Sequence, residues 1–382
     1  MLRKVLASSA LCFALIITSI LPAKVNALSE DSITAPSAVL METSTGKIVF
    51  EKNSHEQRAC ASVTKVMTLL LVFEAIDSGK LDFDDTITAS EHAASMGGSD
   101  IWLENGETMS ADDMIKATVV ASANDAAVAL AEHISGSEEV FVEKMNQRAK
   151  ELKMNDTVFK NCNGLDEEGH ITSAYDVAVM SRELMKHDKI FDYTSIWLDN
   201  LRGGKTQIVN TNKLLKTYNG ITGLKTGTTN DAGCCMAASA TRGNVSLVAV
   251  VLGCKTGKER FSDASALLDY GFANIAVKEL SLPEDIPKSI EVEGGMESSV
   301  PIKCGVSSSI VIDKSTSPEI KTKIDIPEKV AAPVSENQKI GTLTYLVDGK
   351  PVSSFDIVAI KDVIKTSYGS VFEVVFNSLI SL

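Results

Sequence analysis

The order of apolar and polar positions changes along the chain, and each change predicts a different kind of secondary structure. Residues 37–50 alternate and break at Ser44-Thr45-Gly46, a pattern typical of a β-hairpin. From Ser62 to Asp77 apolar residues fall on nearly all sides of a helix, and Gly79 follows where it can end that helix. A helix that is apolar all round is buried, so we expect this segment in the middle of a domain.

The middle of the chain has helical periodicity and then returns to strands after Gly227. Three helices are predicted first, over Ala111–Val120, Asp125–Ile134 and Glu138–Leu152. Two strands and a last helix follow, over Gly233–Ala240, Val245–Gly253 and Lys258–Tyr270. This order predicts an antiparallel sheet with helices packed on it, an α+β domain over residues 28–276.

Residues 277–369 have a different character, because short runs rich in Val, Ile, Ser and Thr alternate there with Gly and Pro. The strands predicted in this part are Ser289–Val292, Ser298–Ile302, Ser309–Ile312 and Lys339–Leu346. We therefore expect a small all-β domain. Residues 370–382 return to helical spacing with an apolar stripe, which indicates an amphipathic helix and a candidate membrane anchor. Its only charged residue is Glu373, so the basic face usual for a helix at a membrane surface is missing.

The first 27 residues have the pattern of a signal peptide. Arg3 and Lys4 precede an uncharged apolar run, Val5–Leu21, and Val25-Asn26-Ala27 supplies small residues for cleavage. The alternative is an uncleaved membrane anchor, although this apolar run is near the lower length limit for a bilayer span. We expect cleavage after Ala27 and an exported protein that acts outside the cell or on the outer face of the cytoplasmic membrane.

The charge and the cysteines exclude several functions. The 382 residues have a net charge of −13, and removal of residues 1–27, which hold three basic and no acidic groups, leaves −16. Such a chain repels nucleic acid and is not attracted to anionic lipid. The cysteines show no CxxC spacing, so the sequence supports neither a zinc site nor a redox motif. We expect no metal and no cofactor.

Three short motifs occur in order along the α+β domain. They are Ser62-Val63-Thr64-Lys65, Ser122-Ala123-Asn124 and Lys225-Thr226-Gly227. Either SxxK or KTG alone arises easily by chance, and a second KTG does occur at Lys255-Thr256-Gly257. The three in this order, with SxxK opening a buried helix and KTG opening a hairpin, are much more specific. The second KTG closes a strand instead, so we interpret it as a solvated turn.

The residue types in these motifs suit acyl transfer by an activated serine. Positions i and i+3 share a helix face, so Lys65 can reach Ser62 and act as the base that removes its proton. Burial and a second cation both lower the pKa of an amine. Lys225 is the expected second cation, and it would remain charged and attract an anionic substrate.

The other motif residues can complete such a site. Ser122 can relay the proton to the leaving amine, Asn124 can bond the substrate's amide, and Thr226 can bind a terminal carboxylate. Gly227 belongs to the same edge. The backbone N–H groups of Ser62 and Thr228 are the expected oxyanion donors. The alternative for Ser62, Ser122 and Asn124 is a role as helix caps, which these residue types favour.

At these residues the sequence resembles the low-molecular-mass penicillin-binding proteins, the serine-type D-Ala-D-Ala carboxypeptidases of the type-5 group. Other stretches resemble the family's pattern as well: Thr45-Gly46-Lys47, Asn163-Gly164-Leu165-Asp166, Asn210-Thr211-Asn212, Ala237-Ala238-Ser239-Ala240 and Leu267-Leu268-Asp269-Tyr270-Gly271-Phe272. The resemblance implies a β-lactamase/transpeptidase-like domain, then a β-rich domain and a C-terminal helix that contacts the membrane. It also implies removal of the terminal D-alanine from peptidoglycan stem pentapeptides, and acylation by penicillin at Ser62.

Three other functions are compatible with parts of this pattern. A class A β-lactamase shares the three motifs and needs a Glu with an Asn four residues on, which Glu151 and Asn155 match superficially. A non-catalytic sensor of β-lactams or wall fragments would not need a nucleophile with its base. Transpeptidation differs only in whether an amine or water receives the acyl group, and no residue decides between them.

Overall fold

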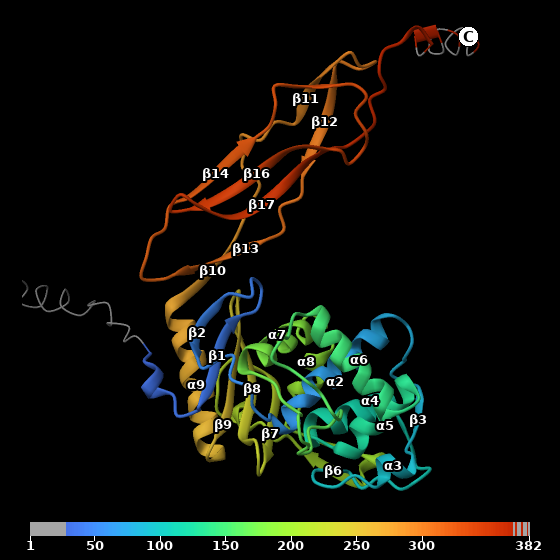
Figure 1. Cartoon of the computed structure of the whole chain (residues 1–382), viewed down its shortest axis with the longest axis vertical. Helices are drawn as coiled ribbons and strands as arrows, with labels where there is room; N and C mark the ends of the chain where they lie inside the picture. Colours follow the sequence, from blue (N-terminus) through green and yellow to red (C-terminus); the bar gives the residue numbers. More distant parts are fainter. Residues whose placement is uncertain (1–27, 370, 373–375, 377–379, 381–382) are drawn as a thin grey trace, which may run out of the picture.

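The computed structural model describes residues 28–369, 371–372, 376 and 380 of the chain. Figure 1 shows an elongated molecule in which an α+β domain carries a separate, narrower β domain. The expected signal peptide, residues 1–27, lies outside the described residues. The expected α+β class with a following all-β domain is confirmed.

A five-stranded antiparallel sheet forms the frame of the first domain. Its strand order is β2-β1-β9-β8-β7. The strands are β1 (Ser37–Glu42), β2 (Ile48–Lys52), β7 (Ile221–Thr229), β8 (Gly233–Arg242) and β9 (Val245–Cys254). Strand β1 pairs with β9, so the first strand of the domain joins the strands from its end in one sheet. The predicted hairpins at both ends of the domain are confirmed, and β7 forms one edge of the sheet.

Helices cover the two faces of this sheet and bury separate sets of apolar residues (Figure 1). One face carries the helical part of the domain, and its helices are α2 (Lys65–Asp77), α4 (Ala111–Lys116), α5 (Asn124–Ser135), α6 (Glu138–Glu151), α7 (Ala174–Leu184) and the short α3 (Glu91–Ala94) and α8 (Ile190–Thr194). The other face is covered by α9 (Gly257–Asn274). Helix α2 is buried on nearly all sides, as its sequence predicted.

Two elements differ from the sequence predictions. The helix expected over Ala111–Val120 ends as α4 at Lys116 and continues as a π-helical turn, η3 (Ala117–Ala121). The apolar spacing is similar in both kinds of turn, so periodicity alone could not separate them. Strand β7 begins at Ile221, before Lys225-Thr226-Gly227, whereas the alternation of the sequence placed strands only after Gly227. This strand contains many small and polar residues, so its sequence does not show the alternation of apolar and polar positions that identifies a strand.

The second domain is built from β10 to β17 and has its own apolar core. Six strands form one sheet in the order β14-β16-β17-β12-β11-β15, and β10 pairs with β13 in a second sheet. The strands are β10 (Ile275–Glu279), β11 (Ser289–Glu293), β12 (Ser299–Cys304), β13 (Ser309–Asp313), β14 (Ile320–Asp325), β15 (Lys329–Ala331), β16 (Lys339–Val347) and β17 (Lys350–Ala359). All four strands predicted here are found.

The two domains meet where α9 runs into β10. Lys314 Nζ donates to Phe272 O at 2.6 Å, and Lys47 Nζ donates to Val311 O at 3.3 Å. Asn244 Nδ2 adds a bond to Val277 O at 2.7 Å. The boundary expected after residue 276 falls within β10.

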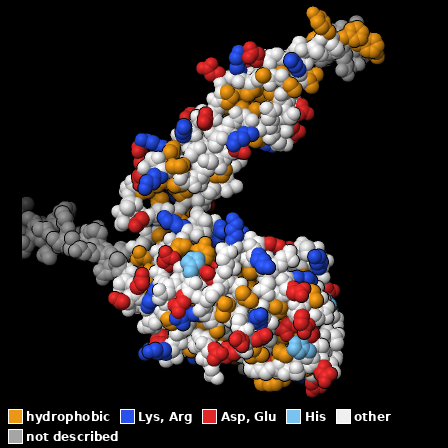
Figure 2. Space-filling model, viewed as in Figure 1, with side chains coloured by type: hydrophobic (Ala, Val, Ile, Leu, Met, Phe, Trp, Pro, Cys, Tyr) orange, Lys and Arg blue, Asp and Glu red, His pale blue; other side chains and the backbone are white. Residues whose placement is uncertain are grey.

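The C-terminal end of the described chain has several exposed apolar side chains, among them Tyr368, Phe372, Phe376 and Ile380. Figure 2 shows them as a hydrophobic group at the tip of the β domain. The rings of Phe372 and Phe376 are stacked with 5.9 Å between their centroids. Among the described residues, we find no helix with the length and apolar character that a membrane span requires.

Candidate active site

Ser62 lies in a single 3₁₀ turn, η2 (Ala61–Thr64), which leads directly into α2. Two glycines allow other backbone segments to approach this turn. A Cβ on Gly164 would lie 2.0 Å from Ala61 O, and one on Gly227 would lie 2.7 Å from Cys60 O. Both would lie 2.9 Å from the backbone nitrogen of Ser62. The cap of this turn is Cys60 rather than Ser62, so capping does not explain the serine.

Lys65 is fully buried and its amine has three oxygen neighbours. Its Nζ lies 3.2 Å from Ser62 Oγ, 2.5 Å from Asn124 Oδ1 and 2.7 Å from Asn163 O. The amide and carbonyl oxygens can only accept hydrogen bonds. A neutral amine has two hydrogens, which those two oxygens use. Its lone pair is then left for the hydroxyl of Ser62.

Burial lowers the pKa of Lys65 to about 7, because the charged form is poorly solvated there. The carboxylates of Asp100 and Asp125 oppose this shift. A lysine with this pKa is neutral in a large fraction of molecules near neutral pH. It can therefore accept a proton, which an ordinary lysine cannot do.

Ser122 and Asn124 follow the π-helical turn and point at the two lysines. Ser122 has a left-handed backbone, with φ of 62° and ψ of 29°. Asn124 is the first residue of α5, and the cap before it, Ala123, makes no side-chain bond. Asn124 Nδ2 donates to Gly97 O at 2.6 Å while its Oδ1 accepts from Lys65. The side chains of this motif thus serve the site rather than the start of α5.

Lys225 on β7 is also buried and contacts the second motif. Its Nζ donates to Ser122 Oγ at 2.7 Å and to Thr226 O at 3.1 Å. Burial lowers the pKa of Lys225 well below the usual lysine value, and the positive charges of Lys65 and Arg260 lower it further. We expected Lys225 to remain charged. Its surroundings instead disfavour the charged form, and an anion beside the amine would oppose this shift.

The rest of the KTG motif lines the edge of the sheet. Thr226 is buried, and its Oγ1 donates to Thr211 Oγ1 at 2.7 Å. Gly227 packs against the turn of Ser62, and Thr228 is exposed. The structure therefore brings all eight predicted site residues to one place, between β7, η2 and the start of α5.

Three residues of the site were not assigned by sequence reasoning. Asn163 accepts from Lys65 through its backbone carbonyl, and Thr211 bonds Thr226. Both lie in stretches noted for their family-like pattern, which could have drawn attention to them. Arg260 on α9 is nearly buried, and its Nη1 donates to Gly227 O at 2.9 Å and to Thr228 Oγ1 at 3.0 Å. No sequence signal identified Arg260, because its contacts cross from a helix to a distant strand.

His170 has a structural place beside this site. Its Nδ1 accepts from Lys160 N at 3.1 Å, so the Nε2–H is left to donate to Thr64 Oγ1 at 2.8 Å. Burial lowers the pKa of His170 to about 4. A neutral histidine therefore holds the turn between Ser62 and Lys65.

The second KTG has a different place. Lys255 and Thr256 are exposed and lie between β9 and α9. Thr256 caps α9: its Oγ1 accepts from Glu259 N at 3.1 Å, and Glu259 Oε2 accepts from Thr256 N at 3.1 Å. The motif is a capping box and not a solvated turn alone.

Comparisons with known proteins agree with this geometry. Residues 24–256 match the family described as D-alanyl-D-alanine carboxypeptidase, and residues 279–365 match the penicillin-binding protein 5 C-terminal domain. The chain is 43% identical to the D-alanyl-D-alanine carboxypeptidase DacF of Bacillus subtilis over 344 residues, which cover 89% of this chain and 88% of that protein. With the Escherichia coli D-alanyl-D-alanine carboxypeptidase DacC it shares 32% identity over 348 residues, covering 88% and 87% of the two chains.

Solved structures give the same result. Penicillin-binding protein 5 from Haemophilus influenzae superposes with a TM-score of 0.76 at 31% identity and covers 89% of this chain and 100% of that chain. Penicillin-binding protein D2 from Listeria monocytogenes in its ampicillin-bound form has a TM-score of 0.58 at 31% identity, covering 63% and 98%. The chain belongs to the family of serine-type D-alanyl-D-alanine carboxypeptidases.

Proposed function

We propose that this D-alanyl-D-alanine carboxypeptidase forms its acyl-enzyme on Ser62, with Lys65 as the general base. The observation that carries the proposal is the environment of the Lys65 amine. Two acceptor-only oxygens use its hydrogens, and the third neighbour is the hydroxyl of Ser62 at 3.2 Å. Its pKa of about 7 matches the task of a base near neutral pH.

The reaction then proceeds in two steps. Lys65 takes the proton of Ser62 as its Oγ attacks the carbonyl of the penultimate D-alanine. The N–H groups of Ser62 and Thr228 bind the oxyanion, and each such donor is worth about 3–4 kcal/mol. The proton passes from Lys65 to the amine of the leaving D-alanine with the hydroxyl of Ser122 as a relay, and the C–N bond breaks. Water next attacks the acyl-enzyme and gives a proton to Lys65. As the ester bond breaks, Lys65 returns this proton to Ser62 Oγ, and the shortened peptide is released.

The edge of β7 supplies the contacts for the substrate's terminal carboxylate. Lys225 and Thr226 bind this carboxylate, and its charge raises the pKa of Lys225 again, because an opposite charge favours the ammonium form. Asn124 uses one hydrogen of Nδ2 for Gly97 O, so its second hydrogen is available to the substrate's amide oxygen. Gly227 leaves the space in which the substrate's backbone can lie beside the strand.

The ring of a β-lactam places a carbonyl and a carboxylate in a similar arrangement, so we extend the proposal to acylation of Ser62 by penicillin. Penicillin-binding protein D2 of Listeria monocytogenes has been solved in ampicillin-bound and cefotaxime-bound forms. A class A β-lactamase activity has little support. Glu151, its candidate for water activation, is half-exposed and bonds Arg148 and Gln147 on its own helix.

The proposal includes the location of the enzyme. Residues 1–27 are removed on export, residues 28–276 carry out catalysis, and residues 277–369 hold that domain away from the chain's end. Residues 370–382 contact the outer face of the cytoplasmic membrane through the apolar side chains that include Phe372, Phe376 and Ile380, which are exposed. A form ending at Gly369 should no longer sediment with membranes, whereas the full chain should; equal sedimentation would contradict membrane contact through this segment.

The central experiment measures acylation and turnover together. After incubation with benzylpenicillin, the intact mass of the wild type should increase by one penicilloyl group, and the enzyme should release D-alanine from diacetyl-Lys-D-Ala-D-Ala. Ser62→Ala should lose both. Ser354→Ala, on β17 of the second domain, is the control and should keep both. An unchanged adduct on Ser62→Ala would refute the nucleophile, and an adduct without D-alanine release would favour a sensor.

A further inference from the structure

The structure assigns a thiol-modification site to Cys234 and Cys254: we infer that they form a reversible cross-strand disulfide by exchange with a small-molecule disulfide. Both thiols are free in the structure. They lie opposite each other on β8 and β9, one strand away from Thr228. Neither thiol takes part in the proposed acyl-transfer chemistry.

A bulge creates the pairing. From Met236↔Val251 onward the register of β8 and β9 is regular, and continued without change it would place Gly253 opposite Cys234. The register instead shifts between Cys234 and Met236, so that Cys254 becomes the partner of Cys234. Gly253 has a φ of 78°, the left-handed backbone that such an extra residue requires and that glycine adopts without strain.

The pairing satisfies the geometric requirement of a disulfide. Opposed residues in an antiparallel pair have Cα atoms about 4.5–5.5 Å apart, and their side chains point to the same face. Disulfides span Cα separations of about 4.4–6.8 Å. Cys234 and Cys254 both pack with the apolar residues under α9. Cys235 belongs to the core on the opposite face, where its Sγ lies 3.3 Å from Ala232 O. The geometry therefore selects Cys254 as the partner and excludes Cys235.

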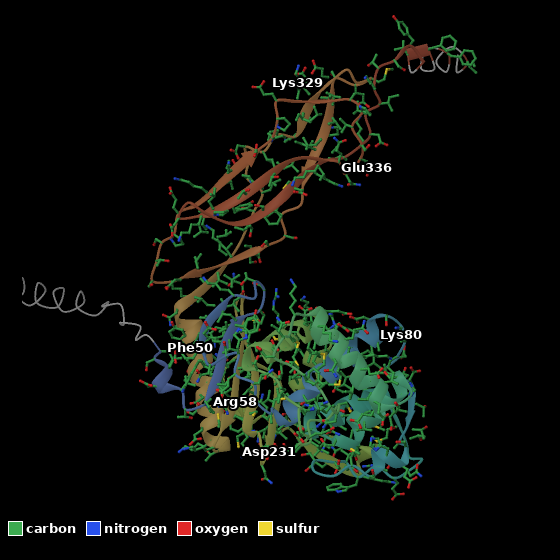
Figure 3. The ribbon with its side chains drawn as sticks, in the orientation of Figure 1. Phe50, Arg58, Lys80, Asp231, Lys329 and Glu336 are labelled. Atoms are coloured by element: carbon green, nitrogen blue, oxygen red, sulfur yellow. The ribbon has the colours of Figure 1, made fainter. Side chains whose placement is uncertain are left out.

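The two thiols differ in access, which sets the order of events. Cys234 is partly exposed and follows the β7–β8 turn, whose Asp231 is labelled at the lower edge of the sheet in Figure 3. Cys254 is 1% exposed. Cys234 gives up its proton to solvent, and its thiolate then attacks one sulfur of the small disulfide and releases one small thiolate. Cys254 then loses its proton and attacks the sulfur of Cys234, releasing the second small thiol. Two protein thiols are oxidised, and one disulfide is reduced to two thiols.

The second step is expected to be slow and to become faster as pH rises. Burial raises the pKa of Cys254 to about 12, and only its thiolate attacks. The groups around it that affect this ionisation are the carboxylates of Asp263 and Glu259, the thiol of Cys234 and the guanidinium of Arg260. Of these, only Arg260 favours the thiolate.

The modification would change the surroundings of the β7 edge. The sulfur of Cys234 lies 3.9 Å from the hydroxyl of Thr228, which also accepts from Arg260. A disulfide turns this sulfur toward β9 and ties β8 to the start of α9, from which Arg260 reaches β7. We therefore expect the oxidised protein to unfold at a higher temperature than the reduced protein.

The test treats the purified full chain with oxidised glutathione at pH 8.5 and maps its peptides without reduction. In the wild type, the peptide of Cys234 should be linked to that of Cys254, the intact mass should fall by two hydrogens, and dithiothreitol should restore both thiols. Cys254→Ser should hold one glutathione on Cys234 instead, because no second thiol can displace it. Cys304→Ser, which removes the other thiol that is partly exposed among the described residues, is the control and should keep the link.

Several results would overturn the inference. Glutathione retained on Cys234 of the wild type would show that Cys254 cannot reach it, and a link from Cys234 to Cys235 would show a different geometry. If Cys254→Ser does not fold, Cys234→Ser can be used in its place. This variant should show no disulfide link and no glutathione on Cys254 or Cys235. Glutathione on Cys254 would contradict the proposal that Cys234 reacts first. These experiments measure peptide and protein masses, so their outcome does not depend on carboxypeptidase activity or on Ser62.

Discussion

The chain contains the tripeptide Lys-Thr-Gly twice, and the two copies have opposite environments. In the first, Lys225 and Thr226 are buried on β7 and contact Ser122 and Thr211. In the second, Lys255 and Thr256 are exposed and lie just before α9, with Thr256 as its N-cap. The same three side chains therefore have different chemistry. Burial perturbs the ionisation of Lys225, whereas the hydroxyl of Thr256 is used to satisfy the backbone N–H of Glu259.

The two copies are also connected. The second caps the helix that carries Arg260, and Arg260 bonds the carbonyl of Gly227 in the first. A short motif therefore acquires its function from what its residues contact. It also provides matched variants in one protein, because each substitution in the first copy has a control in the second.

The largest expected difference is between Lys225→Ala and Lys255→Ala. Removal of the Lys225 amine takes away a contact of Ser122 and the proposed partner of the substrate's carboxylate. We expect the rate constant of acylation by benzylpenicillin to fall about a thousandfold, roughly 4 kcal/mol of transition-state stabilisation. Lys255→Ala should stay within about twofold of the wild type. Equal losses would mean that the first copy owes its role to something other than burial.

Gly227→Ala and Gly257→Ala differ in the space around the new methyl group. At Gly227 the Cβ would lie 2.7 Å from Cys60 O and 2.9 Å from Ser62 N, so the strand or the turn of Ser62 must move. A shift of this kind misplaces the nucleophile, and we expect acylation to slow about a hundredfold. At Gly257 the nearest atom would be Arg260 Nη2 at 3.6 Å, an ordinary contact. The acylation rate constant of Gly257→Ala, measured by stopped flow, should equal that of the wild type.

Thr226→Ala and Thr256→Ala should separate activity from stability. Loss of the Thr226 hydroxyl removes one bond to a charged carboxylate, so we expect kcat/KM for D-alanine release to fall about tenfold. Loss of the Thr256 cap should leave kcat/KM unchanged but lower the free energy of unfolding by about 1 kcal/mol. Urea titration measures the second effect. An activity loss in Thr256→Ala would show that capping α9 matters to β7 through Arg260.

The smallest expected effect is that of pH on the acylation rate. Lys65 acts as a base in its neutral form, and burial lowers its pKa to about 7, so acylation should rise with pH through that value. Between pH 7 and pH 6 the neutral fraction falls about fivefold, and the rate constant should follow it. Lys255→Ala should retain this profile. A rate independent of pH in this range would contradict the role of Lys65.

Much of this architecture could be predicted from the sequence, because it depends on local pattern. The apolar positions after Ser62 predicted a buried helix, and the alternation around Gly243 predicted a hairpin. The spacing of three residues between Ser62 and Lys65 was enough to predict that their side chains meet. The separation of the two KTG copies also followed from their places relative to strands.

Other features depend on contacts between distant segments, which local pattern does not encode. The π-helical turn before Ser122 has only 5 residues, which is too short for apolar spacing to distinguish it from the α-helix that was expected. Asn163 serves Lys65 through a backbone carbonyl, so its side-chain type gave no signal. The lowered pKa of Lys225 results from burial against Ser122 and from the charge of Arg260, a residue that only the packing of α9 brings near.

The left-handed backbone of Ser122 affects which residue could replace it. A serine at a φ of 62° is in a conformation that costs an L-residue about 1 kcal/mol and costs glycine nothing. Glycine at this position would relieve that strain. The resulting protein would be relieved of this strain but would lack the hydroxyl that accepts from Lys225, so that buried amine would lose a partner. At this residue the backbone and the site make opposing demands, and serine keeps the hydrogen bond at the expense of the backbone strain.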